Sequence, residues 1–252
     1  MEGTVPTAAE SGASRRQRLA DARLLLIFTP DLAAEDPMWA LEAAMPFVDI
    51  VQVRPKPVGD RGPNASARAT ITEARAAYDW CMRVLELRAR LDADEAPLVF
   101  VNDRVDVAMA LAENGLDGVH VGTGDMPPKA AREALGDDLM LGLSSHNTRD
   151  LARAWDEPID MLGFGPVFPT ATKGYGGTTL SALSATPKIV GPELAWIAVE
   201  TAPVPVFPIG GINLGNITEL DRAGRAAVGS AILGAQDPGA VARAMRSALL
   251  EV

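Results

Sequence analysis

A group of side chains suited to binding an anion follows an apolar run in the segment GFGPVFPTATKG, residues 163–174. Thr170, Thr172 and Lys173 stand between a proline and a glycine at the end of this segment. Hydroxyl and ammonium groups donate hydrogen bonds to phosphate oxygens, and the ammonium also offsets their charge. The spacing therefore indicates an anion site, whose nature depends on the side chains that the fold brings beside it.

A second group of charged side chains would suit a diphosphate with its metal ion. Asp103 ends the run PLVFVND, and Asp125 follows the next strand-like run, GVHVG. Either could cap a helix or a turn, but at the ends of adjacent strands they favour Mg²⁺, which takes one or two protein carboxylates plus phosphate oxygens. Arg54 and Lys56 follow the run DIVQVR and, with Lys173, would complete a pyrophosphate pocket. As isolated residues these three cations would be solvated surface charges.

Glycines near the C-terminus suggest a separate monophosphate site. Gly210 and Gly211 lie in VPVFPIGGI, and Gly229 and Ser230 lie in AAVGSAIL. Glycine lets a phosphate approach backbone N–H groups closely, and the loops after the last two strands of (β/α)8 barrels often bind phosphate. Tight turns would also explain the glycines, but they would not explain Ser230.

The elements that must position these residues alternate between apolar strand-like runs and Ala-rich helical windows such as residues 67–91. Near-continuous apolar strands are typical of parallel sheets that are covered on both faces. Eight strand and helix units in about 230 residues predict an α/β protein with a single-domain (β/α)8 TIM barrel. A doubly wound open sheet is the alternative, but no GxGxxG follows the first strand. The eight strands are expected at residues 24–30, 49–54, 97–103, 118–122, 139–145, 160–168, 204–212 and 226–233.

Barrel geometry would bring the polar residues to one end of the molecule, because the sites of such enzymes lie at the carboxyl ends of the strands. The predicted strand ends read QVRPK, VNDR, VGTGD, GLSSH, FPTATK, IGGI and VGS, whereas the opposite ends are blander. We expect one mouth formed by Arg54, Lys56, Asn102, Asp103, Asp125, Ser144, Thr170, Thr172, Lys173, Gly210, Gly211, Gly229 and Ser230.

The two histidines indicate a role in the site less clearly than the carboxylates and the basic residues do. His146, in SSHN, could act as a general base or hold a loop by hydrogen bonding, and we favour the structural role. His120 is expected to face the barrel interior or to pack within its strand.

Composition limits the classes of function. The chain has 252 residues, 48% of them hydrophobic, and can bury a sizeable core. Its 23 basic and 33 acidic residues give a formal net charge of -10, which argues against nucleic-acid or anionic-membrane binding. No stretch resembles a membrane span, and the single cysteine, Cys81, fits a reducing compartment such as the cytoplasm.

The chain is expected to divide into a short extension and one catalytic domain. Residues 1–22 are small and polar, which suggests a flexible tail or a loosely docked lead-in. Residues 23–252 would then form the barrel.

The series QVRPK, VNDRVDVAMALAENGLDGVHVGTGDMP, LGLSSH, GFGPVFPTATK, IGGIN and VGSAI occurs in this order between residues 24 and 235. This series resembles the thiamine-phosphate synthase family. The resemblance implies a transferase that joins 4-amino-2-methyl-5-hydroxymethylpyrimidine diphosphate to 4-methyl-5-(2-hydroxyethyl)thiazole phosphate, giving thiamine phosphate and pyrophosphate. The pyrophosphate would leave first, and the thiazole nitrogen would then capture the pyrimidine methylene.

The resemblance also implies a role for each matching residue. The pyrimidine diphosphate would be held by Gln52, Arg54, Lys56, Asn102, Ser144 and Lys173, with Mg²⁺ on Asp103 and Asp125. The thiazole phosphate would be held by Thr170, Thr172, Gly211, Gly229 and Ser230. Lys173, Arg54 and Ser144 would be catalytic, because they would stabilise the charge that collects on the departing pyrophosphate. The expected partners are therefore small phosphorylated molecules, while a homodimer stays open.

Two alternatives remain open at this stage. A thiazole tautomerase-like isomerase shares the barrel and a histidine after the fifth strand, so that His146 could be its acid/base group. A non-catalytic phosphate-ligand-binding protein would keep the site without turnover, and Pro55 does stand where the family pattern has an acidic residue.

Overall fold

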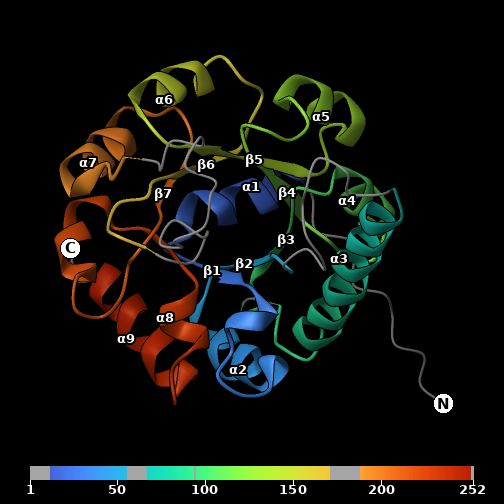
Figure 1. The fold of residues 1–252 in the computed structure, drawn as a ribbon, viewed down its shortest axis with the longest axis horizontal. Helices are drawn as coiled ribbons and strands as arrows, with labels where there is room; N and C mark the ends of the chain where they lie inside the picture. Colours follow the sequence, from blue (N-terminus) through green and yellow to red (C-terminus); the bar gives the residue numbers. More distant parts are fainter. Residues whose placement is uncertain (1–11, 56–66, 94, 171–187, 251–252) are drawn as a thin grey trace.

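A sheet of eight parallel strands curves into a nearly closed barrel in the computed structural model, which describes residues 12–55, 67–93, 95–170 and 188–250 (Figure 1). The strands are β1 (Leu24–Phe28), β2 (Ile50–Val53), β3 (Leu98–Asn102), β4 (Gly118–Val121), β5 (Met140–Ser145), β6 (Met161–Phe164), β7 (Val206–Pro208) and β8 (Ala226–Val228). Their hydrogen-bonded order is β7-β6-β5-β4-β3-β2-β1-β8, and a parallel bridge between Ile209 and Ala227 links β7 to β8. The predicted (β/α)8 TIM barrel is confirmed. The open-sheet alternative is wrong, because an open sheet has two unlinked edges.

Helices surround this barrel on the outside (Figure 1). They are α2 (Pro37–Ala44), α3 (Ala67–Arg88), α4 (Val105–Leu111), α5 (Pro128–Leu135), α6 (Thr148–Ala154), α7 (Gly191–Thr201), α8 (Ser230–Leu233) and α9 (Pro238–Leu250), with the 3-10 helices η1 (Pro30–Leu32), η2 (Met45–Phe47) and η3 (Ile217–Ala223). Side-chain caps define the start of some helices: Asp36 accepts from the N–H groups of Met38 and Trp39 at α2, and Asn147 caps α6 in the same way.

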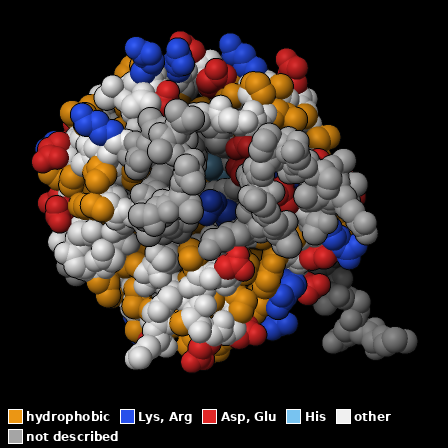
Figure 2. All heavy atoms as spheres, viewed as in Figure 1, with side chains coloured by type: hydrophobic (Ala, Val, Ile, Leu, Met, Phe, Trp, Pro, Cys, Tyr) orange, Lys and Arg blue, Asp and Glu red, His pale blue; other side chains and the backbone are white. Residues whose placement is uncertain are grey.

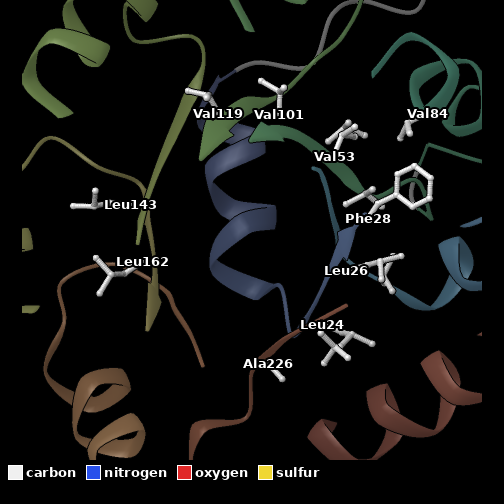
Figure 3. Close-up of a cluster of buried hydrophobic side chains, with 14 of the residues drawn as sticks. Leu24, Leu26, Phe28, Val53, Val84, Val101, Val119, Leu143, Leu162 and Ala226 are labelled. Carbon is white, nitrogen blue, oxygen red and sulfur yellow. The ribbon is translucent and has the colours of Figure 1, made fainter. Parts of the chain in front are cut away.

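Successive residues of each strand point to opposite faces of the sheet. Leu24, Leu26 and Phe28 of β1 point outward and are fully buried under the helices. Figure 3 shows this outer layer around the barrel, with Phe28 beside Val84 of α3. The two-residue alternation explains why both faces of the strands read as apolar in the sequence.

The other half of each strand fills the barrel interior. At the N-terminal ends of the strands the interior is apolar, and it forms a buried cluster separate from the outer layer. This cluster contains Leu19, Ala22, Leu25, Ile50, Leu98, Phe100, Met140, Met161, Phe207 and Ala227. Toward the C-terminal ends of β2 to β5, the inward-pointing residues are polar. The barrel therefore has an apolar floor at the N-terminal ends of its strands and a polar mouth at their C-terminal ends.

Helix α1 (Gly12–Asp21) lies within the segment that was expected to be a flexible tail or a loosely docked lead-in. It lies at the centre of the helix ring in Figure 1, and Leu19 is only 1% exposed within the interior cluster. Arg16 donates to Asp160 at 2.7 Å, and Arg18 donates to the carbonyl of Ala96. The polar composition of this segment did not indicate a packed helix. Only one side of the helix enters the barrel, and its arginines bind strand ends. Residues 1–11 lie outside the described residues.

Three aspartates fix the N-terminal ends of the strands against each other. Asp49, Asp117 and Asp160 immediately precede β2, β4 and β6. Each carboxylate accepts a backbone N–H from the neighbouring strand, at 2.9 Å from Leu24, 2.7 Å from Val99 and 2.8 Å from Leu141 respectively. Each also pairs with an arginine, namely Arg246, Arg88 and Arg132. Because a carboxylate accepts several bonds at once, each aspartate ties two strands to an outer helix.

Candidate active site

A cavity opens at the carboxyl ends of the strands, on the side opposite α1. Figure 2 looks onto this mouth and shows basic, acidic and histidine side chains beside one another at the centre of the face. Nine residues predicted from separate segments line the cavity: Gln52, Arg54, Asn102, Ser144, Thr170, Gly210, Gly211, Gly229 and Ser230. His120 and His146 line it as well. The barrel therefore brings most of the predicted strand ends into one space, whereas the predicted metal ligands Asp103 and Asp125 do not line it.

Gln52 and Asn102 form the first polar layer above the apolar interior. Gln52 is 5% exposed, and its Nε2 donates to Oδ1 of Asn102 at 2.6 Å across β2 and β3. Arg54 follows β2, and its backbone N–H donates to the carbonyl of Phe28 at 2.8 Å. This bond continues the β1–β2 pairing and fixes Arg54 at the rim, where its guanidinium can offer several donors to an anion.

His120 and Ser144 form the next part of this layer. The two side chains are 3.0 Å apart from Nε2 to Oγ, and His120 is 7% exposed. The ring lies over Gly142 of β5 and Gly163 of β6, where a Cβ atom would come within 2.4 Å of Nδ1 and 3.3 Å of Cε1 respectively. His120 thus faces the barrel interior, as one of the two interpretations of the sequence expected.

The predicted glycines serve both as turns and as cavity walls. Gly210 and Gly211 have φ values of 99° and 69°, in the left-handed region that favours glycine. A Cβ at Gly211 would lie 2.4 Å from the carbonyl oxygen of Pro169, so this turn packs tightly against the segment that leads to Thr170. Gly229 precedes α8, which begins at Ser230. The turn explanation is correct for Gly210 and Gly211, and both still line the cavity.

Asp103 directly follows β3, and Asp125 lies in the turn after β4; neither is among the residues that line the cavity. The N–H of Asp103 donates to the carbonyl of His120 at 2.8 Å, and Oδ2 of Asp125 accepts from the N–H of Gly122 at 2.8 Å. Asp103 has φ 63°, a conformation that aspartate tolerates better than most residues. It does not occupy the capping position of α4, which is held by Arg104. Strained backbone of this kind is common at functional sites.

The donor set of these two aspartates fits Mg²⁺. Carboxylate oxygens are ligands that this ion prefers, and it commonly keeps water and substrate oxygens in its remaining positions. No cluster of three or more His, Cys, Asp or Glu residues suited to a metal occurs among the residues that the structure describes. Two carboxylates are fewer than the ligands of such a cluster, so an ion held there would need oxygen ligands from elsewhere.

His146 has a clear structural contact. Its Nδ1 lies 2.8 Å from the carbonyl oxygen of Gly165. Since a carbonyl only accepts, Nδ1 must carry the hydrogen. The bond holds the chain after β5 against the chain after β6, which matches the structural role that the sequence favoured.

Three predicted site residues, Lys56, Thr172 and Lys173, lie outside the described residues. The sequence did not single out the pairing of His120 with Ser144 or its dependence on Gly142 and Gly163. Glycines at inward positions of two neighbouring strands, in LGLSS and MLGF, were the available signal for a large side chain nearby.

Comparison with known proteins agrees with this geometry. The family model described as thiamine monophosphate synthase matches residues 24–232. The chain belongs to the thiamine monophosphate synthase family. Family members include a thiamine-phosphate synthase of Synechococcus sp. (strain CC9605), 38% identical over 92% of this chain, and one of Haloquadratum walsbyi, 38% identical over 80%. The chain spans 57% of the length of the first relative and 78% of the second.

A solved structure supports the same family assignment. A thiamine phosphate pyrophosphorylase from Pyrococcus furiosus is 28% identical and superimposes with a TM-score of 0.70, covering 94% of this chain and 98% of its own.

Among the residues that the structure describes, none of the helices combines the length and the apolar character that a membrane span needs.

Proposed function

We propose that this chain is a thiamine-phosphate synthase, which joins the pyrimidine diphosphate to the thiazole phosphate with release of pyrophosphate. The observation that carries the proposal is the convergence of nine predicted residues, from β2 to α8, on one cavity at the barrel mouth. Family membership supports the same reaction. The two groups of residues in the cavity suit two anionic substrates of different kinds.

The side of the cavity formed by β2, β3 and β5 would bind the pyrimidine diphosphate. Gln52 and Asn102 present amide groups that can donate to and accept from an aminopyrimidine. Arg54 and the Ser144 hydroxyl would donate to the diphosphate oxygens. The sequence adds Lys56 and Lys173 to this side.

Mg²⁺ would be held by Asp103 and Asp125, and it would supply positive charge that stabilises the leaving pyrophosphate. The backbone of Asp103 is held by its N–H bond to His120, and the carboxylate of Asp125 is held by the N–H of Gly122. Because the aspartates are charged and the diphosphate is strongly anionic, they would repel one another without a cation between them.

The opposite side, formed after β6, β7 and β8, would bind the thiazole phosphate. Thr170 and Ser230 bring hydroxyl groups, while Gly211 and Gly229 leave the backbone open to a phosphate. The sequence adds Thr172 to this group. This arrangement would hold the thiazole nitrogen in reach of the pyrimidine methylene, which converts the joining step into a unimolecular one.

The cavity floor would protect the reaction from water. Leu25, Ile27, Met161 and Phe207 line the cavity below its polar layer. An electron-rich pyrimidine that loses pyrophosphate leaves a cation, which water would capture if it entered. An apolar floor and a bound thiazole exclude that water. No general base is needed, because the acceptor nitrogen already carries a lone pair.

The remaining proposals concern partners and place. We place the enzyme in the cytoplasm and expect no nucleic-acid partner, on the basis of the net charge of -10 and the single buried cysteine. A homodimer is also compatible with the chain.

The decisive experiment measures pyrophosphate release from both substrates by the purified chain, with and without Mg²⁺. We expect release only with Mg²⁺ and only when both Asp103 and Asp125 are present. Asp103→Ala and Asp125→Ala should each abolish release without loss of fold, whereas Glu133→Ala, an exposed acid on α5, should leave it unchanged. Binding of both substrates without turnover would instead indicate the non-catalytic binder. Isomerisation of the thiazole phosphate without joining would indicate the tautomerase.

A further inference from the structure

The imidazole of His120 lies beside two glycines, Gly142 of β5 and Gly163 of β6, whose missing side chains leave space for the ring. Gly142 is directly paired with His120 across β4 and β5, and Gly163 follows on β6. Any side chain at Gly142 would meet the ring, because a Cβ there would be 2.4 Å from Nδ1 and 3.1 Å from Cγ. At Gly163 it would meet the far edge of the ring at 3.3 and 3.5 Å. The ring is therefore confined, and its Nε2 is directed at Ser144.

The direction of the hydrogen bond between His120 and Ser144 decides what Ser144 can do. If Nε2 accepts, the serine hydrogen is used inside the protein and Oγ presents only lone pairs to the cavity. If Nε2 donates, the serine hydrogen is available to a ligand in the cavity. A diphosphate carries acceptor oxygens, so only the second arrangement lets Ser144 bind it.

We propose that His120 is a positioning residue whose Nε2–H donates to Oγ of Ser144 and thereby directs the serine hydroxyl hydrogen at an anionic oxygen of the substrate. This inference rests on the proposed function for the identity of that substrate. His120 does not itself contact the reacting atoms in this account. Its effect is to remove the rotational freedom of the hydroxyl, so that the donor is already oriented when the diphosphate arrives.

His146 provides an internal reference for this assignment. Its Nδ1 donates to the carbonyl of Gly165, so its neutral ring carries the hydrogen on Nδ1. The proposal assigns the hydrogen of His120 to Nε2 instead. The two histidines of the chain should therefore be opposite tautomers.

Nitrogen-15 NMR of the untagged protein at mildly alkaline pH tests the tautomers directly. With only two histidines, two sets of ring signals are expected, and His146→Gln assigns them. We expect the Nε2–H form for His120 and the Nδ1–H form for His146, both with and without Mg²⁺ and inorganic pyrophosphate. A hydrogen on Nδ1 of His120 would overturn the proposal. This measurement needs no turnover, so it stands apart from the test of the proposed function.

A double-mutant cycle tests whether His120 acts through Ser144. Loss of a side chain that orients a metal ligand typically costs roughly 10- to 100-fold in metal affinity or activity. Because His120 would likewise orient a ligand-binding group, we expect His120→Leu to lower kcat by about the same factor. In the Ser144→Ala background the same substitution should change kcat less than about twofold. His120→Gln, whose amide nitrogen can take the place of Nε2, should restore most of the activity.

The control for this cycle is Val119→Ala, the preceding residue of β4. Val119 points away from the cavity and is fully buried in the outer layer, so its loss should lower stability but not kcat. Equal losses from His120→Leu in the two backgrounds would show that His120 does not act through Ser144. If the unmodified chain has no turnover at all, the proposed function fails, while the tautomer measurement still decides the His120 contact.

Discussion

Because His120 packs closely against Gly142, we predict that Gly142→Ala will lower both the stability and the activity of the protein. A Cβ atom added at Gly142 would lie 2.4 Å from Nδ1 of His120 and 2.8 Å from Cε of Met161, whereas ordinary contacts begin near 3.4 Å. The ring would have to move by about 1 Å in a closely packed interior. Overpacking of this kind costs about 1–3 kcal/mol in the free energy of unfolding.

For a chain of this size, that cost corresponds to a fall in Tm of roughly 2–12 °C. Calorimetry of Gly142→Ala measures it, and Gly124→Ala is the control because a Cβ there would have no neighbour within 4 Å. Pyrophosphate release by Gly142→Ala should also fall, because the displaced ring no longer orients Ser144. In a His120→Ala background, where the ring is absent, Gly142→Ala should lower Tm by less than it does in the unmodified chain. An unchanged Tm for Gly142→Ala, or an equal loss in the two backgrounds, would show that the ring does not limit the space at Gly142.

Three further predictions concern other parts of the molecule. Leu19→Ala should lower Tm by roughly 5–15 °C, because a leucine in the interior cluster is lost; an unchanged Tm would mean that α1 does not close the barrel. Burial raises the pKa of the Cys81 thiol to about 12, so a thiol reagent at neutral pH should label the protein only after denaturant unfolds it; rapid labelling of the native protein would contradict this burial. Lys173→Ala should lower turnover roughly a hundredfold or more if Lys173 offsets charge on the leaving group, and an unchanged rate would remove it from the site.

The barrel could be predicted because each of its strands has a local pattern of apolar residues. Apolar runs indicated where the strands lie, although residues 230–233, expected in the last strand, form α8. The parallel sheet followed from the lack of polar alternation in these runs. The rule that sites lie at carboxyl strand ends then gathered Gln52, Asn102, Ser144 and Ser230 without any contact being known. These residues come from four different strand ends, and the structure places all four at one cavity.

Other features depend on packing that a sequence does not display. Helix α1 appears as a polar tail until the barrel offers Leu19 an interior and Asp160 offers Arg16 a partner. The role of His120 depends on which side of β4 faces inward and on the missing side chains of Gly142 and Gly163. The connection between β7 and β8 forms the 3-10 helix η3 where an α-helix was expected. For α1 and His120, contacts distant in sequence decide the outcome.

The most direct test of the account is product formation by the chain alone. When the pyrimidine diphosphate, the thiazole phosphate and Mg²⁺ are mixed with the purified protein, thiamine phosphate and pyrophosphate should appear in equal amounts. Formation of neither product by correctly folded protein, under conditions where both substrates bind, would contradict the claim that the residues at the barrel mouth form a working synthase site.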